Sequence, residues 1–330
     1  MRISLLLLGG LVVVAFISML VGPSQVGTAS LLKACFSGLY TGDFHIPDTE
    51  KAILFSIRLP RIIFAGLVGA ALAAAGVVFQ GLLRNPLADP YILGISGGSA
   101  VGAIVAIMVG VSVLPLGTAG LSFLGALLTI ILVYGIAKTN RELQSNTLLL
   151  AGVIVNAFFS AVIMFLVSVS SNTQIHSILF WLMGDLSLVV GDDIPMIALF
   201  LLIGFLVMYV YARSLNLIVA GEETAMQLGV DVEKTKKILF LAASLVTGAA
   251  VSVSGIIGFV GLIIPHIMRM LLGSDHRLLF PASLLFGASF LVVADTLART
   301  IMAPAELPVG VITALCGAPY FIYLLRRRAV

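Results

Sequence analysis

Charged side chains are scarce in this chain. Asp, Glu, Lys and Arg together make up 10% of its 330 residues, whereas apolar residues make up 60%. A soluble domain carries about 25% charged residues, so the composition excludes an ordinary soluble protein. The net charge of +3 gives no reason to expect a nucleic-acid partner.

Cysteine and histidine are equally scarce, with two cysteines and four histidines. Cys35 lies in the loop after the first apolar run and Cys316 lies inside the last run, so we expect no disulfide between them. The histidines are scattered, and no metal-ligand spacing occurs. The phosphate-binding pattern G-x-x-x-x-G-K-[ST] is also missing. We therefore predict no metal site, no bound cofactor and no ATPase domain in this chain.

Long apolar runs are what the sequence has in quantity. About 20 helical residues cross the roughly 30 Å of hydrocarbon in a bilayer, and continuous runs favour helices over a β-barrel. We predict an all-α integral membrane protein in which residues 1–330 form a single transmembrane domain. The first run follows Arg2 and resembles a signal peptide, but we expect it to be a retained span. The predicted spans, about ten, are 3–21, 60–83, 92–110, 118–137, 147–169, 194–211, 238–254, 256–271, 279–298 and 309–325.

The distribution of lysine and arginine predicts the orientation. With ten spans both termini lie on the same side, and most of the 18 Lys and Arg residues fall on that side. Because basic residues accumulate in cytoplasmic loops, we expect both termini in the cytoplasm of a multi-pass cell (inner) membrane protein.

A faint internal repeat divides the chain. Gly69, Gly76 and Pro86 recur at the same offset as Gly248, Gly255 and Pro265. Five spans, an odd number, separate the two copies, so the halves would run in opposite directions. This pattern predicts an inverted repeat, which is common in transporters.

One polar segment, about 214–237, interrupts the apolar runs on the cytoplasmic side. Within it, Glu222 to Leu228 reads as a short helix with acids in its first turn, where the helix dipole favours negative charge. Ala225 and Leu228 provide an apolar edge, with Met226 beside it, and Gly229 provides a stop. The segment is either a solvated connector or a surface for a soluble partner.

Six motifs of the chain resemble the FecCD-type permeases, the membrane subunits of ABC importers for iron-siderophore, haem and vitamin B12. They run in order from the second span to the C-terminus, and together they are specific. The motifs are I-R-L-P-R-I at 57–62, Q-G-L-L-R-N-P-L-A-D-P at 80–90, L-L-L-A-G at 148–152, G-E-E-T-A-M-Q-L-G-V at 221–230, G-F-V-G-L-I-I-P-H-I-M-R at 258–269 and A-E-L-P-V-G-V-I-T-A-L-C-G-A-P-Y-F-I-Y-L-L at 305–325.

The resemblance implies a vitamin B12 permease-like subunit that works as a homodimer around one pathway. Two cytoplasmic ABC ATPases would bind below and would hold ATP and Mg²⁺, and a periplasmic or lipid-anchored binding protein would dock above. This chain would then be no enzyme. Which chelate it carries stays open. The residues implied to couple to the ATPase are Glu222, Glu223, Thr224, Ala225, Met226, Leu228 and Gly229.

Two further groups of residues acquire roles from the resemblance. Arg58, Arg61 and Arg299 fall at the family's positions for docking the binding protein, and they lie outside, against the positive-inside bias. Arginine pairs bidentately with carboxylates, although anchoring to lipid headgroups is the alternative. Asp295 precedes Arg299 by four residues and is expected to hold it. The cytoplasmic gate is expected at Asn85, Leu87, Ser145 and Asn146.

Two other classes of function remain as alternatives. A secondary transporter that uses no ATP would need no cytoplasmic coupling surface, and ion-coupled carriers usually contain buried acids. Asp295 is the main candidate of that kind. A membrane hydrolase would need a nucleophile and a base facing each other, and nothing in the spacing unites Ser96, Ser99 and His266.

Overall fold

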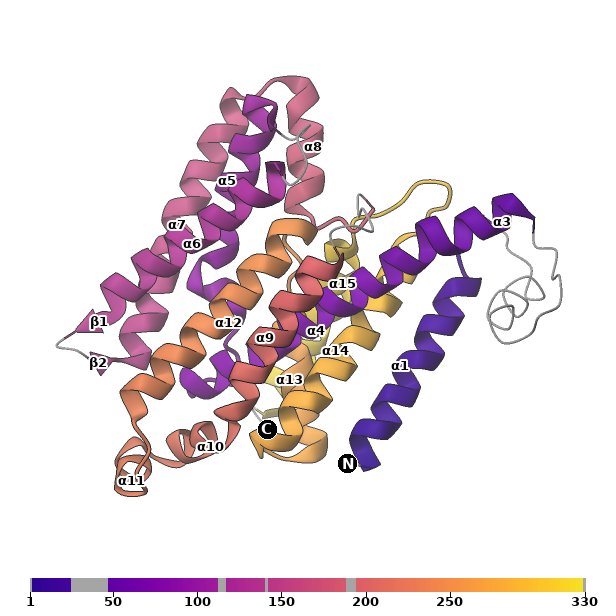
Figure 1. Cartoon of the computed structure of the whole chain (residues 1–330). Helices are drawn as coiled ribbons and strands as arrows, with labels where there is room; N and C mark the ends of the chain where they lie inside the picture. The colour runs from indigo at the N-terminus through magenta and orange to yellow at the C-terminus, as the bar shows by residue number, and fades with distance from the viewer. Residues whose placement is uncertain (1, 25–46, 112–116, 140–141, 188–193, 329–330) are drawn as a thin grey trace.

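The computed structural model of the chain describes residues 2–24, 47–111, 117–139, 142–187 and 194–328. These residues form a bundle of helices (Figure 1). A short antiparallel pair, β1 (Lys138–Thr139) and β2 (Glu142–Leu143), is the one strand pairing within the described ranges. Cys35 lies outside the described residues, so the expectation of no disulfide to Cys316 stays a prediction.

Each of the ten predicted spans coincides with a helix, which confirms the all-α membrane class. In the described ranges, six helices are long and apolar enough to cross a membrane, and α9 with α10 (Ala212–Ala220), bent by 51°, would be a seventh. The helices at the predicted spans are α1 (Arg2–Leu20), α4 (Leu59–Leu82), α5 (Ile95–Val109), α6 (Gly117–Ala137), α7 (Ser145–Val169), α9 (Ile194–Val210), α12 (Val232–Ser254), α13 (Val260–Leu272), α14 (His276–Ala298) and α15 (Val309–Arg328).

Three of these helices are shorter than the predicted spans require. The apolar parts of α5, α13 and α15 cover 10–17 residues. The helix α5 lies between Gly94 and Gly110, and both glycines have left-handed φ angles of 74° and 78°. A left-handed residue ends a helix, and glycine adopts that conformation without steric cost. Among the described residues, the number of full-length spans is therefore six or seven, with three shorter apolar helices beside them.

Local structure also departs from the prediction around the second span. Helix α3 (Asp48–Ala52) and the π-helical turn η1 (Ile53–Arg58) continue directly into α4, so the apolar helix runs from Asp48 to Leu82. Pro60 lacks an N–H and would interrupt a regular α-helix. The π-helical turn just before it absorbs this irregularity. Helix α8 (Asn172–Leu182) was not predicted. Its N-terminus is capped by Gln174 Oε1, which accepts from the Ser171 N–H at 3.1 Å.

Helix α4 forms the centre of the bundle, with almost every residue after Ile63 buried. Close contact with its neighbours depends on glycine. A Cβ at Gly69 would lie 2.3 Å from the Gly287 carbonyl oxygen, and a Cβ at Gly76 would lie 1.9 Å from that of Gly261. These two glycines let α4 pack backbone to backbone on α14 and α13, as small residues do in membrane helices.

The packing pairs support the predicted inverted repeat. Helix α4 packs on α14, and its counterpart α12 packs on α6. In the same way α5 packs on α6 while α13 packs on α14. Exchanging the two halves of the chain therefore maps one set of neighbours onto the other.

The bundle has two distinct ends. The start of α1 and the end of α15 lie at the same end as α10 and α11 (Glu222–Gln227), and α3 lies at the opposite end (Figure 1). We name these the α11 end and the α3 end. The predicted coupling and gate residues lie at the α11 end, and the predicted docking arginines lie at the α3 end.

Candidate functional site

The short helix predicted in the polar segment is present as α11. It follows Gly221, carries Glu222 and Glu223 in its first turn, and ends at Gln227, one residue before the predicted end. Gly229 has a φ of 82°, the left-handed conformation that stops a helix. The local prediction of a helix with acidic start and glycine stop is therefore confirmed.

The faces of α11 differ from the prediction in one respect. Ala225 is fully buried against Ile218 and Val232, whereas Met226 and Leu228 are 56% and 62% exposed. Ala225 therefore anchors the helix to α10 and α12. The exposed apolar surface of this segment consists of Met226 and Leu228, because α10 and the start of α12 cover the side of Ala225.

Glu222 connects three elements at the α11 end. Its Oε2 accepts from Lys236 Nζ of α12 at 2.7 Å, and its Oε1 lies 3.3 Å from Arg84 Nη2, just after α4. Arg84 also donates to the Ile218 carbonyl oxygen of α10 at 2.7 Å. Arg84 itself has a left-handed φ of 47°, which is strained for a residue with a side chain. The ion pair with Glu222 and the hydrogen bond to Ile218 hold this strained residue between α4, α10 and α11.

The four gate candidates come together beside this junction. Asn85 Oδ1 accepts from the Leu87 N–H at 2.9 Å, which forms the turn after α4. Ser145, the first residue of α7, donates its hydroxyl to the Leu82 carbonyl oxygen at 2.7 Å. Asn146 and Leu87 are exposed. The structure thus places both halves of the predicted gate side by side, and Asn85 directly follows Arg84 in the chain.

A cavity of about 590 Å³ lies between the ends of α4, α10 and α13. Arg84 lines it, together with Gln80, Arg269, His266 and His276. Arg269 Nη1 donates to Gln80 Oε1 at 2.8 Å, and Gln80 Nε2 donates to the Leu262 carbonyl oxygen at 3.0 Å. Sequence analysis missed this basic cavity because its lining residues come from separate segments. Among the described residues, no group of three or more His, Cys, Asp or Glu could hold a metal ion.

Two of the family motifs meet at a buried carboxylate. Asp89 Oδ1 accepts from the Tyr91 N–H at 2.9 Å, and the carboxylate also accepts from the Phe259 N–H. The Tyr91 hydroxyl donates to the Ile257 carbonyl oxygen at 2.6 Å and accepts from the Ile257 N–H at 3.0 Å. Burial raises the pKa of Asp89 to about 6, because the charged form loses its hydration.

At the α3 end, Arg61 makes the most complete ion pairs of the chain's described residues. Its Nε and Nη2 both donate to Asp295 Oδ1, at 3.0 and 2.9 Å. Its Nη1 donates to Glu306 Oε2 at 2.7 Å. The predicted pair between Asp295 and Arg299 is present at 3.8 Å, but the nearer partner of Asp295 is Arg61. Sequence analysis did not identify Glu306 as a partner.

Arg58 and Arg299 hold the C-terminal end of α1. Arg58 Nη1 donates to the carbonyl oxygens of Met19 and Leu20 at 2.6 and 3.2 Å, and its Nη2 donates to that of Ser24. Arg299 Nη2 donates to the Ser18 carbonyl oxygen at 2.9 Å. A cation at a helix C-terminus binds carbonyl groups that have no partner in the helix. Each of these arginines therefore has a structural role.

Burial separates these arginines from the expected outer surface. Arg58, Arg61 and Arg299 are 2%, 8% and 3% exposed. We expected these arginines to be exposed because they flank predicted spans. The sequence alone does not show that α1, the acid of α14 and the acid of the loop after it pack around them. The docking role stays a prediction, and any docking by these arginines would involve side chains that are already buried and hydrogen-bonded within the chain.

Comparisons with known proteins agree with this geometry. A profile of the FecCD transport family matches residues 10–327. The chain is 49% identical over 287 residues to the cobalamin import system permease protein BtuC of Halobacterium salinarum, covering 87% of this chain and 77% of that protein. It is 39% identical over 332 residues to the hemin transport system permease protein HmuU of Yersinia pestis, covering 99% and 97%.

A solved structure is similar over nearly the whole chain. It is an inward-facing conformation of a metal-chelate type ABC transporter, with a TM-score of 0.85, 34% identity and 99% coverage of both chains. Agreement over this length sets aside the secondary transporter and the membrane hydrolase. ATP is bound by a separate ATPase chain, and this chain performs translocation without catalysis. The chain belongs to the FecCD transport family and is the multi-pass permease subunit of an ABC importer.

Proposed function

We propose that this permease works as a homodimer that imports a metal chelate, with cobalamin as the first candidate cargo. The names of its relatives support a corrinoid or haem, and an iron-siderophore belongs to the same class. The cavity of about 590 Å³ is in the range that holds drug-sized ligands. A corrinoid is larger than that, which favours a pathway between two chains.

The proposed energy input enters through α11. One observation carries this proposal: Glu222 joins α11 to the end of α4 through Arg84 and to α12 through Lys236. A displacement of α11 by the ATPase would reach Arg84 directly, and Arg84 precedes Asn85 in the proposed gate. Met226 and Leu228 would seat in the ATPase, while Ala225 and Gly229 shape the helix. Two ATPase subunits would bind, one for each copy of the permease.

The proposed orientation places the α11 end on the cytoplasmic side of the cell's inner membrane. Lys234, Lys236, Lys237 and Arg269 support it, because basic residues gather on the cytoplasmic side. The binding protein, periplasmic or lipid-anchored, would then dock at the α3 end. Glu306 is 37% exposed at the side chain, so its contact with Arg61 reaches the surface. A carboxylate of the binding protein would replace Glu306 on Arg61, and the buried Arg58 and Arg299 would support the site.

Co-purification and uptake test the coupling proposal. We expect the double variant Met226→Asp, Leu228→Asp to lose the ATPase during detergent purification, because two charges replace the exposed apolar contact. Gln227→Glu is the control, since it adds a negative charge to the same helix without removing an apolar side chain. ATP-dependent uptake of labelled cyanocobalamin into proteoliposomes that contain all subunits measures the function. Full retention of the ATPase by the double variant would contradict the role of α11.

Cargo and coupling can fail separately. If the ATPase is bound and ATP is hydrolysed but cyanocobalamin is not taken up, the cargo assignment is wrong while the coupling proposal stands. The ligand that co-purifies with the partner binding protein would then identify the chelate. Cysteine cross-linking along α7 tests the homodimer, and transport by single permease chains in nanodiscs would contradict it.

A further inference from the structure

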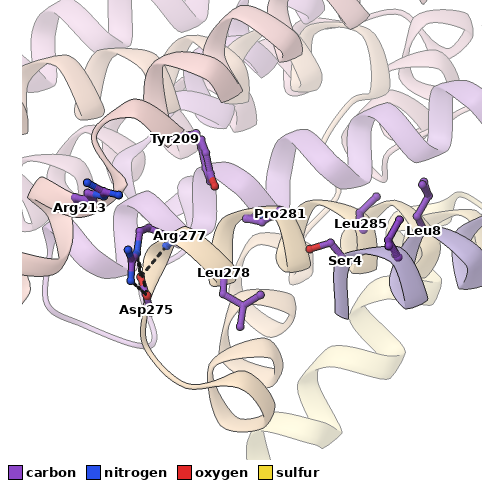
Figure 2. A pocket seen from close by; sticks show the side chains of 10 residues that line it. Ser4, Leu8, Tyr209, Arg213, Asp275, Arg277, Leu278, Pro281 and Leu285 are labelled. Atoms are coloured by element: carbon purple, nitrogen blue, oxygen red, sulfur yellow. Dashed lines mark hydrogen bonds and ion pairs between the residues drawn. The ribbon is translucent and has the colours of Figure 1, made fainter. Parts of the chain in front are cut away.

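A groove of about 730 Å³ lies at the α11 end, outside the proposed gate and coupling residues. Its walls come from the start of α1, the joint between α9 and α10, and the start of α14 (Figure 2). The bend of 51° between α9 and α10 therefore lies at the groove. The joint is followed by α10, which leads through Gly221 into the coupling segment at Glu222.

The groove is polar at one side and apolar at the other. Figure 2 shows Arg213, Asp275 and Arg277 together on one side and Leu8 and Leu285 on the other. The apolar wall continues onto α1, where Leu5 and Leu8 are exposed. Because α1 is a candidate membrane span, hydrocarbon surrounds this wall. An occupant of the groove therefore needs a polar head and an apolar chain.

The charge of the polar side is positive by one unit. Arg277 forms an ion pair with Asp275, with 2.7 Å between Nη2 and Oδ2. Hydrogen bonds from Arg277 and Asn216 hold the pKa of Asp275 below its ordinary value, so this pair stays ionised and neutral overall. Arg213 is exposed, and no described residue forms a hydrogen bond or ion pair with it. Its charge is therefore available to an anion.

The start of α1 lacks the polar ties that hold its other end. Within the described ranges, the side-chain hydrogen bonds to α1 reach Ser18, Met19 and Leu20. At its start α1 contributes Ser4, Leu5 and Leu8 to the groove. A ligand that bridges these residues and Arg213 would fasten this end of α1 to the α9–α10 joint.

We propose that this groove is a binding site for one anionic phospholipid of the phosphatidylglycerol type. The phosphate contacts Arg213, with Tyr209 beside it, and one acyl chain lies along Leu5, Leu8 and Leu285. An anionic headgroup satisfies the unneutralised charge, and the chain covers the exposed leucines. Free phosphate would leave the apolar wall uncovered, and a zwitterionic lipid carries a second charge that Arg213 would repel. The positive-inside arrangement places this lipid in the cytoplasmic leaflet.

Native mass spectrometry of the full-length chain, delipidated and then titrated with defined lipids, tests the proposal. We expect phosphatidylglycerol to bind about fivefold more tightly than phosphatidylcholine of the same chain length, the ratio that one basic residue contributes near an anionic headgroup. Arg213→Gln should abolish this preference, and Arg213→Lys should restore most of it. Arg326→Gln is the matched control. Arg326 is exposed at the end of α15, and its substitution removes the same charge at a position away from the groove.

A second variant tests the apolar half of the site. Leu8→Trp fills the groove without changing its charge, and we expect it to weaken the binding of both lipids. Thermal unfolding of this variant checks that the protein is folded. Equal binding of the two lipids by the wild type would overturn the proposal. So would an Arg213→Gln variant that keeps its preference. If inorganic phosphate raises the unfolding temperature as much as phosphatidylglycerol does, the site binds a free oxyanion and the lipid assignment is wrong.

Discussion

Asp295 at the α3 end is 1% exposed between Arg61 and Arg299, whereas Glu222 at the α11 end is 33% exposed between Arg84 and Lys236. Both carboxylates bridge two cations that come from different helices. Water competes for the pair of Glu222 with Arg84, whose side chain is 41% exposed, whereas the side chain of Lys236 is 5% exposed. Exposed pairs contribute about 0–1 kcal/mol. Removing one partner of a buried pair leaves a charge that neither water nor protein stabilises.

The difference in burial between these ion pairs predicts that the two ends differ in rigidity. The pair of Glu222 with the exposed Arg84 can break at little cost in free energy, which suits an element that moves when the ATPase works. The network of Asp295 holds α1, α4 and α14 together and resists rearrangement. We expect the α3 end to act as the rigid part of the permease, with Glu306 as the partner of Arg61 that can be exchanged.

The largest effect is expected from removing the buried carboxylate. Asp295→Ala leaves Arg61 and Arg299 buried beside an apolar side chain, and we expect it to lower the free energy of unfolding by about 3–5 kcal/mol. Glu222→Ala should cost less than Asp295→Ala, because Glu222 is 33% exposed and one of its two partners, Arg84, is 41% exposed. Thermal unfolding of the two variants in detergent measures both values. Equal losses would show that burial does not distinguish the two ends.

A second buried acid sharpens the comparison because no cation of the described residues pairs with it. The pKa of Asp89 is raised to about 6, against about 3.9 in an unfolded chain. Between these values the folded state binds more protons than the unfolded state, so stability falls as pH rises from about 4 to 6. The total is on the order of 3 kcal/mol, at 1.36 kcal/mol per pKa unit.

Asp89→Asn should therefore remove this pH dependence. Asparagine keeps an oxygen that accepts from the Tyr91 N–H but carries no charge. At pH 7 we expect the variant to be at least as stable as the wild type, whereas Asp295→Asn should be less stable because it weakens a buried ion pair. Unfolding temperatures at pH 4.5 and 7 distinguish the two. A wild-type protein whose stability does not change between these values would contradict the raised pKa.

The smallest effect on stability, and a large one on coupling, is expected at Arg84. Arg84→Gly relieves the left-handed backbone by about 1 kcal/mol and loses an exposed ion pair of similar size, so the unfolding temperature should change little. The link between α11 and α4 is lost, so we expect less cargo transported per ATP hydrolysed. Arg84→Lys keeps the charge and should retain part of the coupling. Unchanged transport per ATP in Arg84→Gly would show that Arg84 is not part of the link.

Sequence patterns predicted the elements whose causes are local. The ten apolar runs became helices because any long apolar run in hydrocarbon must satisfy its own backbone hydrogen bonds. The acids before Ala225 and the glycine after Leu228 defined α11 because capping and helix-dipole effects act within one turn. Short apolar runs were harder: α5 and α13 are less than full spans, and left-handed residues beside them set their ends.

The sequence predicted which residues belong to the candidate sites, but it did not predict their contacts or their burial. The gate residues were identified through the resemblance, and their proximity follows from the packing of α7 near the end of α4, where Ser145 donates to Leu82. The arginines of the α3 end were expected at the surface. Their burial follows from Ser18, Asp295 and Glu306, which lie far from Arg58 and Arg61 in the sequence and close in space.

By itself, the sequence determined the membrane class, the positions of the helices, the family and the short polar helix, because hydropathy, capping and motifs depend on neighbouring residues. The tertiary structure alone decided which charges are buried, which face α11 presents and where the groove and the basic cavity form. Those properties depend on how far each group is from water and from opposite charge. Such distances exist only after helices from distant parts of the chain have packed together.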